Sequence, residues 1–221
     1  MNKYSILIEL KSDTTFGRGD GVAGLIDSEV EHDENGLPYL RGRSLKGLLQ
    51  EECANALFSV KQFNSAKLSD LETIADKLFG KGGSDLDADA KMFVGDALLP
   101  KDLREAVKYA IQEEQVTPSE LLKSLTAIRR QTAMSETGAP KPESLRSMRV
   151  VLRETVFESE LMFSEDYAPG SNEIALLGAC VAALRRAGLG RNRGRGKVKA
   201  RLIGAVDLTD SCLSNFASLI H

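Results

Sequence analysis

The feature that most constrains the fold is a pattern of apolar residues that occurs twice along the chain: strand, helix, strand. Residues 3–11 alternate apolar and polar side chains, which is typical of a half-buried strand. A helix is predicted to begin at Ser44, its N-cap, because apolar residues recur from there at helical spacing. This stripe consists of Leu45, Leu48, Leu49, Cys53, Ala56 and Leu57. Residues 91–99 are again strand-like.

The second half of the chain repeats this order. Residues 151–163 predict one long strand, and Ser171 is predicted to cap a helix that ends at Gly188. The apolar residues of this helix are Ile174, Leu177, Val181 and Leu184, and those of a final strand are Val198, Ala200 and Leu202. Two such units in series are the split β-α-β arrangement. We therefore predict an α+β fold, ferredoxin-like or of a modified RNA-recognition type, with long insertions.

Two segments do not fit these units and are interpreted as insertions within a single domain that spans residues 1–221. The first covers about residues 59–100. Within it, residues 59–90 are polar and contain glycine, so they are expected to lie outside the core. The second covers about residues 126–148, shows no clean period and is predicted to project as a loop or hairpin. Between them, the Thr-Pro-Ser-Glu sequence from Thr117 is a capping box that predicts a short helix.

The most unusual stretch lies near the C-terminal end and combines glycine with arginine. From Arg185 to Arg201 every charged residue is basic, although the whole chain has a formal net charge of -3. These residues are Arg185, Arg186, Arg191, Arg193, Arg195, Lys197, Lys199 and Arg201. Glycines in this stretch let the main chain approach an anion, and arginine binds phosphate oxygens in pairs. We interpret the stretch as a site for the RNA backbone; the alternative is a solvated hairpin that serves only solubility.

A second cluster of cations surrounds the start of the first predicted helix. Arg41, Arg43 and Lys46 lie close to the helix N-terminus, whose free N–H groups favour phosphate. We interpret this cluster as a second anion site; the alternative is a capped helix with surface arginines. Only 5% of the residues are aromatic, and no predicted strand carries the rings on which bases stack. Binding is therefore expected to involve the RNA backbone rather than the bases.

The sequence argues against several other kinds of site. Gly19, Gly21 and Gly24 form a Gly-x-Gly-x-x-Gly motif, but no helical period follows it, as a dinucleotide site requires. Three widely separated cysteines offer neither a disulfide framework nor a zinc knuckle. His32 is the only histidine before the final residue, so any catalysis must depend on carboxylates. Without a signal-peptide pattern or a membrane-length apolar run, we expect a cytoplasmic protein.

Four motifs occur in a specific order along the chain. They are Gly36-Leu-Pro-Tyr-Leu-Arg-Gly-Arg-Ser-Leu-Lys-Gly47 after an acidic loop, Leu78-Phe-Gly with Phe93-Val-Gly-Asp-Ala-Leu98, Ile128-Arg-Arg with Ser144-Leu-Arg146, and Gly-Leu-Gly-Arg-Asn-Arg-Gly-Arg-Gly-Lys-Val198. Together they resemble the RAMP superfamily, the repeat-associated RNA-binding proteins of CRISPR systems. Within it, the chain is most similar to the backbone subunit of type III interference complexes. The resemblance covers nearly the whole chain.

The resemblance implies a palm with a projecting thumb hairpin, and it implies which residues contact guide RNA. With the anion sites described above, the RNA-binding set is Arg41, Arg43, Ser44, Lys46, Arg129, Arg130, Arg146, Arg191, Asn192, Arg193 and Arg195. The implied partners are the guide RNA, a complementary target RNA, and other effector subunits, including copies or paralogues of this chain. No membrane partner is expected.

The resemblance also implies a cleavage site. In cleaving members an aspartate in the loop after the first strand cuts the target RNA with a divalent metal such as Mg²⁺. Asp27, in Gly-Leu-Ile-Asp, matches that position and is the candidate catalytic and metal-binding residue. The same loop is rich in acids, so Asp20 or Asp33 is the alternative match.

Three hypotheses follow for the function. The first is a backbone subunit that is also a metal-dependent endoribonuclease acting on the guide-paired target RNA. The second is a catalytically inactive structural RNA-binding subunit of the same complex. The third is a guide-processing endoribonuclease of the same superfamily, which would depend on His32.

Overall fold

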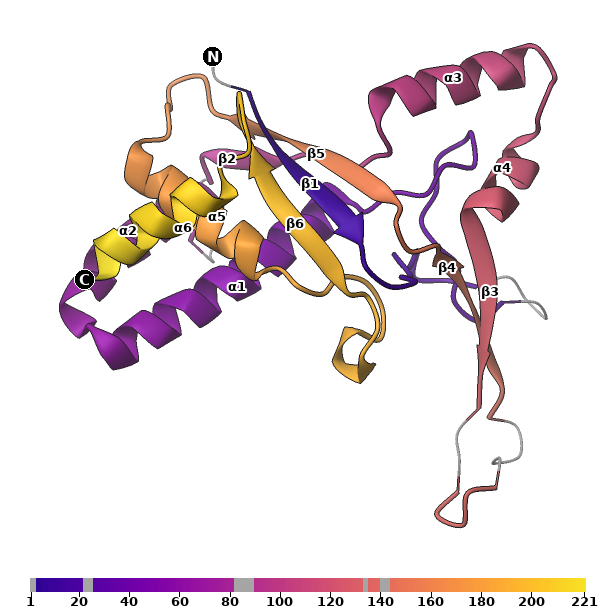
Figure 1. The fold of residues 1–221 in the computed structure, drawn as a ribbon, viewed down its shortest axis with the longest axis horizontal. Coiled ribbons are helices and arrows are strands. Elements are labelled where there is room, and N and C mark those ends of the chain that lie inside the picture. Colours follow the sequence, from indigo (N-terminus) through magenta and orange to yellow (C-terminus); the bar gives the residue numbers. More distant parts are fainter. Residues whose placement is uncertain (1–2, 22–25, 82–89, 133–134, 140–143) are drawn as a thin grey trace.

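Four antiparallel strands form the central sheet of the protein (Figure 1). The computed structural model describes residues 3–21, 26–81, 90–132, 135–139 and 144–221. The sheet order is β2-β5-β1-β6, with β1 at Tyr4–Leu10, β2 at Met92–Val94, β5 at Val156–Phe163 and β6 at Val198–Ile203. In chain order the first and third sheet strands are central and the second and fourth are at the edges, which is the ferredoxin-like arrangement. The predicted α+β class is confirmed.

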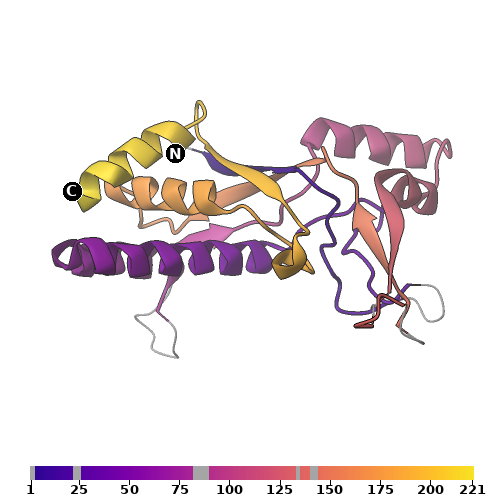
Figure 2. The same ribbon diagram turned by 60° about the horizontal axis from the view of Figure 1, so that its bottom comes forward.

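The alternation predicted from the sequence decides which face of the sheet is covered. Ile6, Ile8 and Leu10 of β1 are fully buried, as are Phe157 of β5 and Leu202 of β6. Helices gather on this face, and their side chains complete one core (Figure 2). These helices are α1 at Gly42–Phe63, α2 at Leu68–Phe79, α5 at Ser171–Ala183 and α6 at Thr209–Ile220.

Helix α5 lies at the centre of this layer, and residues 175–181 are buried around its whole circumference. Its Gly178 gives room for α6, because a Cβ atom there would come within 2.2 Å of the Cβ of Cys212. Helix α6 was not predicted from the sequence, yet Cys212 is almost fully buried in the core. Among the described helices, none is long and apolar enough to span a membrane.

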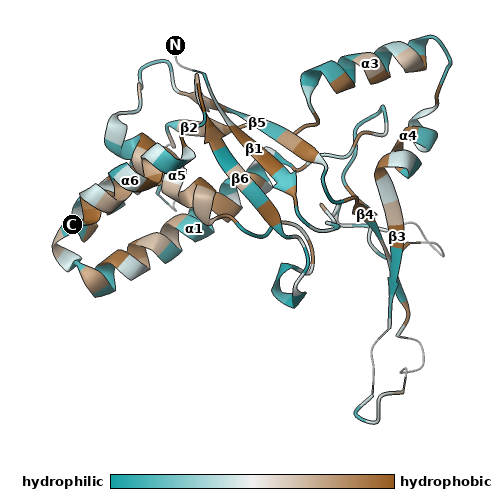
Figure 3. Ribbon diagram, viewed as in Figure 1, coloured by the Kyte–Doolittle hydropathy of each residue, from teal (hydrophilic) through white to brown (hydrophobic). Residues whose placement is uncertain are grey.

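A second group of elements extends from the end of the sheet that is far from α6 (Figure 1). It contains α3 at Lys101–Gln112, α4 at Pro118–Leu125, and a hairpin of β3 at Thr126–Gln131 and β4 at Arg146–Val151. The capping box of Thr117 and Glu120 begins α4, as predicted. The hairpin projects from the body, and its outer part is largely hydrophilic (Figure 3). The predicted projection is confirmed, although residues 133–134 and 140–143 lie outside the described part of the chain.

Some predicted boundaries are wrong. Residues 151–163 are not one strand: the chain turns between β4 and β5, where Glu154 has a φ of 71°. The prediction failed because apolar residues flank the short polar run at residues 153–155, although the two flanks belong to different sheets. Residues 59–90 were expected to lie outside the core, but Leu78 and Phe79 of α2 are buried in it.

The predicted ends of α1 and α5 are also wrong. Helix α1 begins at Gly42 after the N-cap residue Arg41, so Ser44 lies within the first turn. The N-cap of α5 is Gly170 rather than Ser171. Helix α5 ends at Ala183, before Gly188, because the chain then pairs Arg186 with Lys197 in an extended bridge.

Candidate nucleic-acid interface

The glycine-rich segment, defined as residues 185–197, forms a tight loop built on left-handed backbone. Gly188, Gly190, Gly194 and Gly196 all have positive φ angles, which side chains other than glycine rarely adopt. At Gly196 a Cβ atom would lie 1.9 Å from the carbonyl oxygen of Ala187, so the loop requires glycine there. A short 3₁₀ turn at Arg191–Arg193 forms the tip.

Arg186 braces this loop from inside. Its Nη1 atom donates to the carbonyl oxygens of Arg191 and Arg195, each at 3.3 Å. The guanidinium of Arg186 is therefore used to fix the loop, while other cations of the segment face outward. Arg185, Arg193 and Lys197 are exposed, and among the described residues no carboxylate lies within ion-pairing distance of them.

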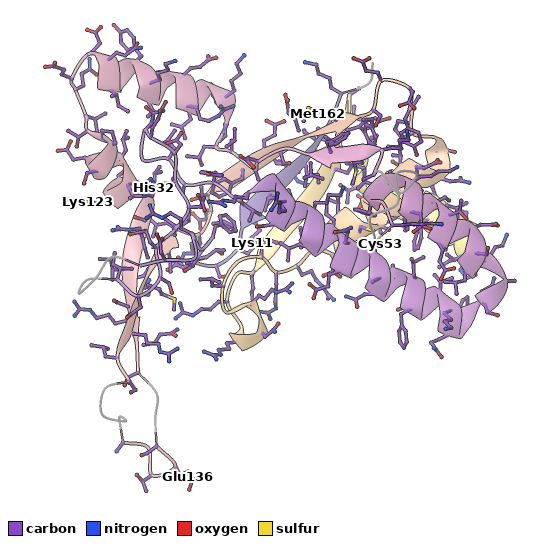
Figure 4. The ribbon with its side chains drawn as sticks, turned by 180° about the vertical axis from the view of Figure 1, so that it is seen from behind. Lys11, His32, Cys53, Lys123, Glu136 and Met162 are labelled. Carbon is purple, nitrogen blue, oxygen red and sulfur yellow. The ribbon has the colours of Figure 1, made fainter. Side chains whose placement is uncertain are left out.

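Two shallow hollows border this loop, and both include Lys11 at the end of β1. Figure 4 shows Lys11 near the centre of the molecule, between α1 and the glycine-rich loop. The first hollow has a volume of about 640 Å³. It is lined by Lys11, Glu51, Glu52, Ala183, Arg185, Arg186, Arg191, Asn192, Lys197 and Val198. Arg191 is partly neutralised here, because its Nη2 atom lies 2.8 Å from Oε2 of Glu51.

The second hollow lies on the other side of Lys11, at the root of the hairpin, and has a volume of about 600 Å³. It is lined by Lys11, Ser12, Asp13, Arg129, Leu152, Arg153, Glu154, Gly194 and Arg195. Arg129 of β3 makes an ion pair with Asp13 at 2.7 Å. The fold thus brings hairpin residues and the glycine-rich segment to one surface, although they are far apart in the sequence.

Arg195 joins the glycine-rich segment directly to the hairpin. Its Nη1 atom donates to Sδ of Met148 at 2.8 Å, and the side-chain amide of Gln131 lies against the same guanidinium. Arg130 and Arg146 are exposed farther along the same two strands. Arginines from the glycine-rich segment, β3 and β4 therefore lie on the hairpin or in contact with it.

The cations at the start of α1 form a separate group that lines neither hollow. The helix N-terminus is already capped, because Oδ1 of Asp96 accepts from the N–H of Gly42 at 2.7 Å. Arg41 pairs with Glu31 at 2.8 Å, and Nζ of Lys46 donates to the carbonyl oxygen of Met92 at 3.3 Å. Burial lowers the pKa of Lys46. Exposed Arg43 and Ser44 complete this group.

Two of the three glutamates in the loop after β1, Glu29 and Glu31, are buried and structural. Glu29 forms an ion pair with Arg149 at 2.8 Å, and both side chains are largely shielded from solvent. Glu31 accepts from Arg41 and from the hydroxyl of Tyr39. Desolvation, together with this hydrogen bond to Glu31, raises the pKa of Tyr39.

The three candidate aspartates of the same loop have different surroundings. Asp33 closes a turn, because its Oδ1 accepts from the N–H groups of Asn35 and Leu37. Asp20 is exposed and paired with Arg18 at 2.8 Å, which lowers the pKa of that carboxyl. His32 belongs to the same turn as Asp33, with Nδ1 at 3.0 Å from the carbonyl oxygen of Asp33.

Asp27 is exposed and lies against the root of the hairpin. Its Oδ2 accepts from the N–H of Ser147 at 2.6 Å and from the Ser147 hydroxyl at 3.3 Å. Ser147 is followed by Met148, which contacts Arg195. Of the three aspartates, Asp27 is therefore the one held against β4, the strand that contacts Arg195.

Asp27 offers a magnesium ion a single carboxylate ligand at this position. Within the described parts of the chain, no three potential ligands from His, Cys, Asp and Glu cluster together. Mg²⁺ keeps most of its waters and is commonly held by one or two carboxylates together with substrate phosphates. Asp27 fits that mode of binding, in which the RNA supplies the remaining oxygen ligands, and it does not fit a preformed metal cage.

Several residues of the surface were not singled out from the sequence. Lys11 and Arg153 line the hollows, and Arg149 fixes the acidic loop. Arg185, Arg186 and Lys197 were recognised only as part of the basic stretch. The position of Lys11 directly after a strand was the one available signal, since loops at strand ends often carry functional residues.

Comparisons with known proteins agree with this architecture. A model of the RAMP superfamily matches residues 7–199. A search of curated proteins found no match. Among solved structures, a chain of the type III-B Cmr-beta complex bound to cognate target RNA is 13% identical, with a TM-score of 0.60 over 96% of this chain and 98% of that chain. A chain of the apo Cmr-beta complex is 16% identical, with a TM-score of 0.59 over 91% and 97%.

Proposed function

Because this chain belongs to the RAMP superfamily, we propose that it is a guide-RNA-binding backbone subunit of a type III CRISPR interference complex. The observation that carries the binding role is the pair of basic hollows that meet at Lys11. Both are open and shallow, as suits a flexible strand rather than a small molecule. The similar chains come from Cmr-beta complexes, one of which is bound to target RNA, and this supports assembly with RNA and other subunits.

The cations recognise the sugar–phosphate backbone. No described carboxylate is ion-paired with Arg185, Arg193 or Lys197. These three cations can therefore bind a phosphate without first breaking an ion pair. Arg129 and Arg191 would exchange Asp13 and Glu51 for phosphate oxygens, which makes their contribution smaller. Contacts of this kind depend on salt and not on base sequence.

We further propose that Asp27 takes part in metal-dependent cleavage of the guide-paired target RNA. Its carboxylate is exposed at the root of the hairpin, where Ser147 fixes its orientation through two hydrogen bonds. A divalent cation, when bound, would neutralise charge on the scissile phosphate. The role of the chain is to hold one carboxylate beside the RNA backbone that the arginines position.

Substitution of Asp27 in the assembled complex tests this function. Asp27→Ala should lower the rate of target cleavage about a hundredfold or more in Mg²⁺, since a metal-positioning carboxylate contributes several kcal/mol to the transition state. Guide-RNA affinity should stay unchanged, because removing an acid cannot weaken an electrostatic interaction with phosphate. A chelator should abolish cleavage by the wild type.

Asp20→Ala and Asp33→Ala serve as matched controls from the same loop. Loss of cleavage in one of them, with normal cleavage by Asp27→Ala, would assign the site to that aspartate. A wild-type complex that binds RNA without cutting it would favour the inactive structural subunit. The guide-processing alternative requires His32, so His32→Ala should leave guide RNA of normal length if our proposal is right.

A further inference from the structure

The segment that carries Asp27 adds a third strand-like edge to the hairpin. Ser28 forms a parallel bridge with Met148 of β4. The N–H of Asp27 donates to the carbonyl oxygen of Ser147 at 2.9 Å, and the N–H of Arg149 donates to that of Ser28 at 3.0 Å. Residues 27–29 therefore lie beside residues 147–149.

Two pairs of side chains connect this edge to β4. Asp27 and Glu29 are two residues apart in extended chain, so they lie on the same side, as do Ser147 and Arg149. Ser147 binds the carboxylate of Asp27, and Arg149 binds that of Glu29. Met148, between them, contacts Arg195 of the glycine-rich segment.

The two pairs differ in their exposure to water. The Asp27–Ser147 contact is exposed, so water competes for its hydrogen bonds. The Glu29–Arg149 pair is shielded, with 4% of the Glu29 side chain and 14% of the Arg149 side chain exposed. Nη1 of Arg149 also donates to Oγ1 of Thr126 at 3.2 Å, and Oε1 of Glu29 also accepts from the N–H of Val30 at 2.8 Å. The buried pair therefore fixes the segment more firmly than the exposed contact does.

We propose that Arg149 is the positioning residue for the cleavage site. Through Glu29 it holds the segment that carries Asp27 against β4, at a fixed distance from the RNA that Arg195 and its neighbours bind. This inference rests on the proposed function of Asp27, but its physical content is the attachment of residues 26–30 to the hairpin. Arg149 itself is too enclosed to touch RNA and acts through Glu29.

Arg149→Met tests the inference with two measurements. In the assembled complex, target cleavage should slow at least tenfold at saturating target RNA, while the dissociation constant for guide or target RNA stays within twofold. In the full-length free chain, amide hydrogen exchange should speed up far more in residues 26–30 than in the central sheet, which should stay the most protected part of the chain. Arg149→Lys keeps the charge toward Glu29 and should restore part of the cleavage rate. Arg104→Met, on α3, is the control for the loss of an arginine elsewhere.

The outcomes separate this inference from the function on which it rests. Unchanged exchange in residues 26–30, or exchange that rises over the whole sheet together with a loss of RNA binding, would overturn the positioning role. A wild-type complex that does not cut would overturn the cleavage proposal, while localised exchange would still support the attachment through Arg149. If Arg149→Met does not fold, Glu29→Met with Arg149→Met leaves no buried charge unpaired and permits the same two measurements.

Discussion

The acidic loop after β1 and the glycine-rich segment near the C-terminal end carry opposite charges and use them in opposite ways. In the acidic loop, Glu29 and Glu31 are buried against arginines, and Asp33 is committed to a turn. In the glycine-rich segment, Arg185 and Arg193 are exposed, and no described carboxylate pairs with them. The first region uses charge to hold the fold together, whereas the second leaves charge exposed to solvent.

This difference shows that a high density of charge in the sequence does not identify a binding or catalytic site. What distinguishes a functional charge is whether the folded chain already supplies its counter-ion. By this criterion Glu29 and Glu31 are structural, whereas Asp27 is exposed, lies against the hairpin and has no described basic partner. In the basic segment, glycines with positive φ angles form the tight loop, and one arginine, Arg186, holds it through hydrogen bonds to two of its carbonyl oxygens.

The largest effect expected from this contrast is on stability. Glu29→Ala leaves Arg149 buried without its partner, which should lower the free energy of unfolding by about 3 kcal/mol. For a chain of this size that corresponds to a drop in melting temperature of roughly 6–12 °C. Glu34→Ala, an exposed acid of the same loop, is the control and should melt like the wild type. Equal melting of the Glu29 and Glu34 variants, measured by calorimetry, would contradict the structural role of the buried pair.

The smallest effect is expected for an exposed pair in the same loop. Asp20→Asn removes the partner of Arg18, but both side chains are solvated, so the melting temperature should barely change. RNA affinity should stay the same or rise slightly, since one negative charge is lost. A clear loss of stability would mean that the exposed acids also support the fold, and the contrast between buried and exposed charge would then be wrong.

The sequence predicted the parts of the fold that depend on local patterns. The inward-facing residues of β1 and β6 follow from their alternation, and the capping box before α4 is a local signal that the structure confirms. The boundary between β4 and β5 could not be predicted, because neither glycine nor proline marks the turn at residues 152–155. Helix caps were misplaced where a distant residue acts as the cap, as Asp96 does for α1.

For the candidate site, the sequence identified the basic segment but not its surroundings. The contacts of Asp27 with Ser147 and of Glu29 with Arg149 each join residues 120 positions apart, and no local pattern reports such pairs. Lys11 likewise becomes part of the surface only when the sheet brings the end of β1 beside the glycine-rich loop. The assignment of the individual RNA-binding residues stays a prediction.

The most direct test of the account is the salt dependence of RNA binding. The wild-type chain and the Arg193→Gln, Arg195→Gln double variant should be compared on several single-stranded RNAs of unrelated sequence. For about four neutralised phosphates, the wild type should give a log–log slope near -3, and the double variant a shallower slope with weaker binding to every RNA alike. A slope unaffected by the substitutions, or a loss confined to one RNA sequence, would contradict binding of the RNA backbone by the glycine-rich segment.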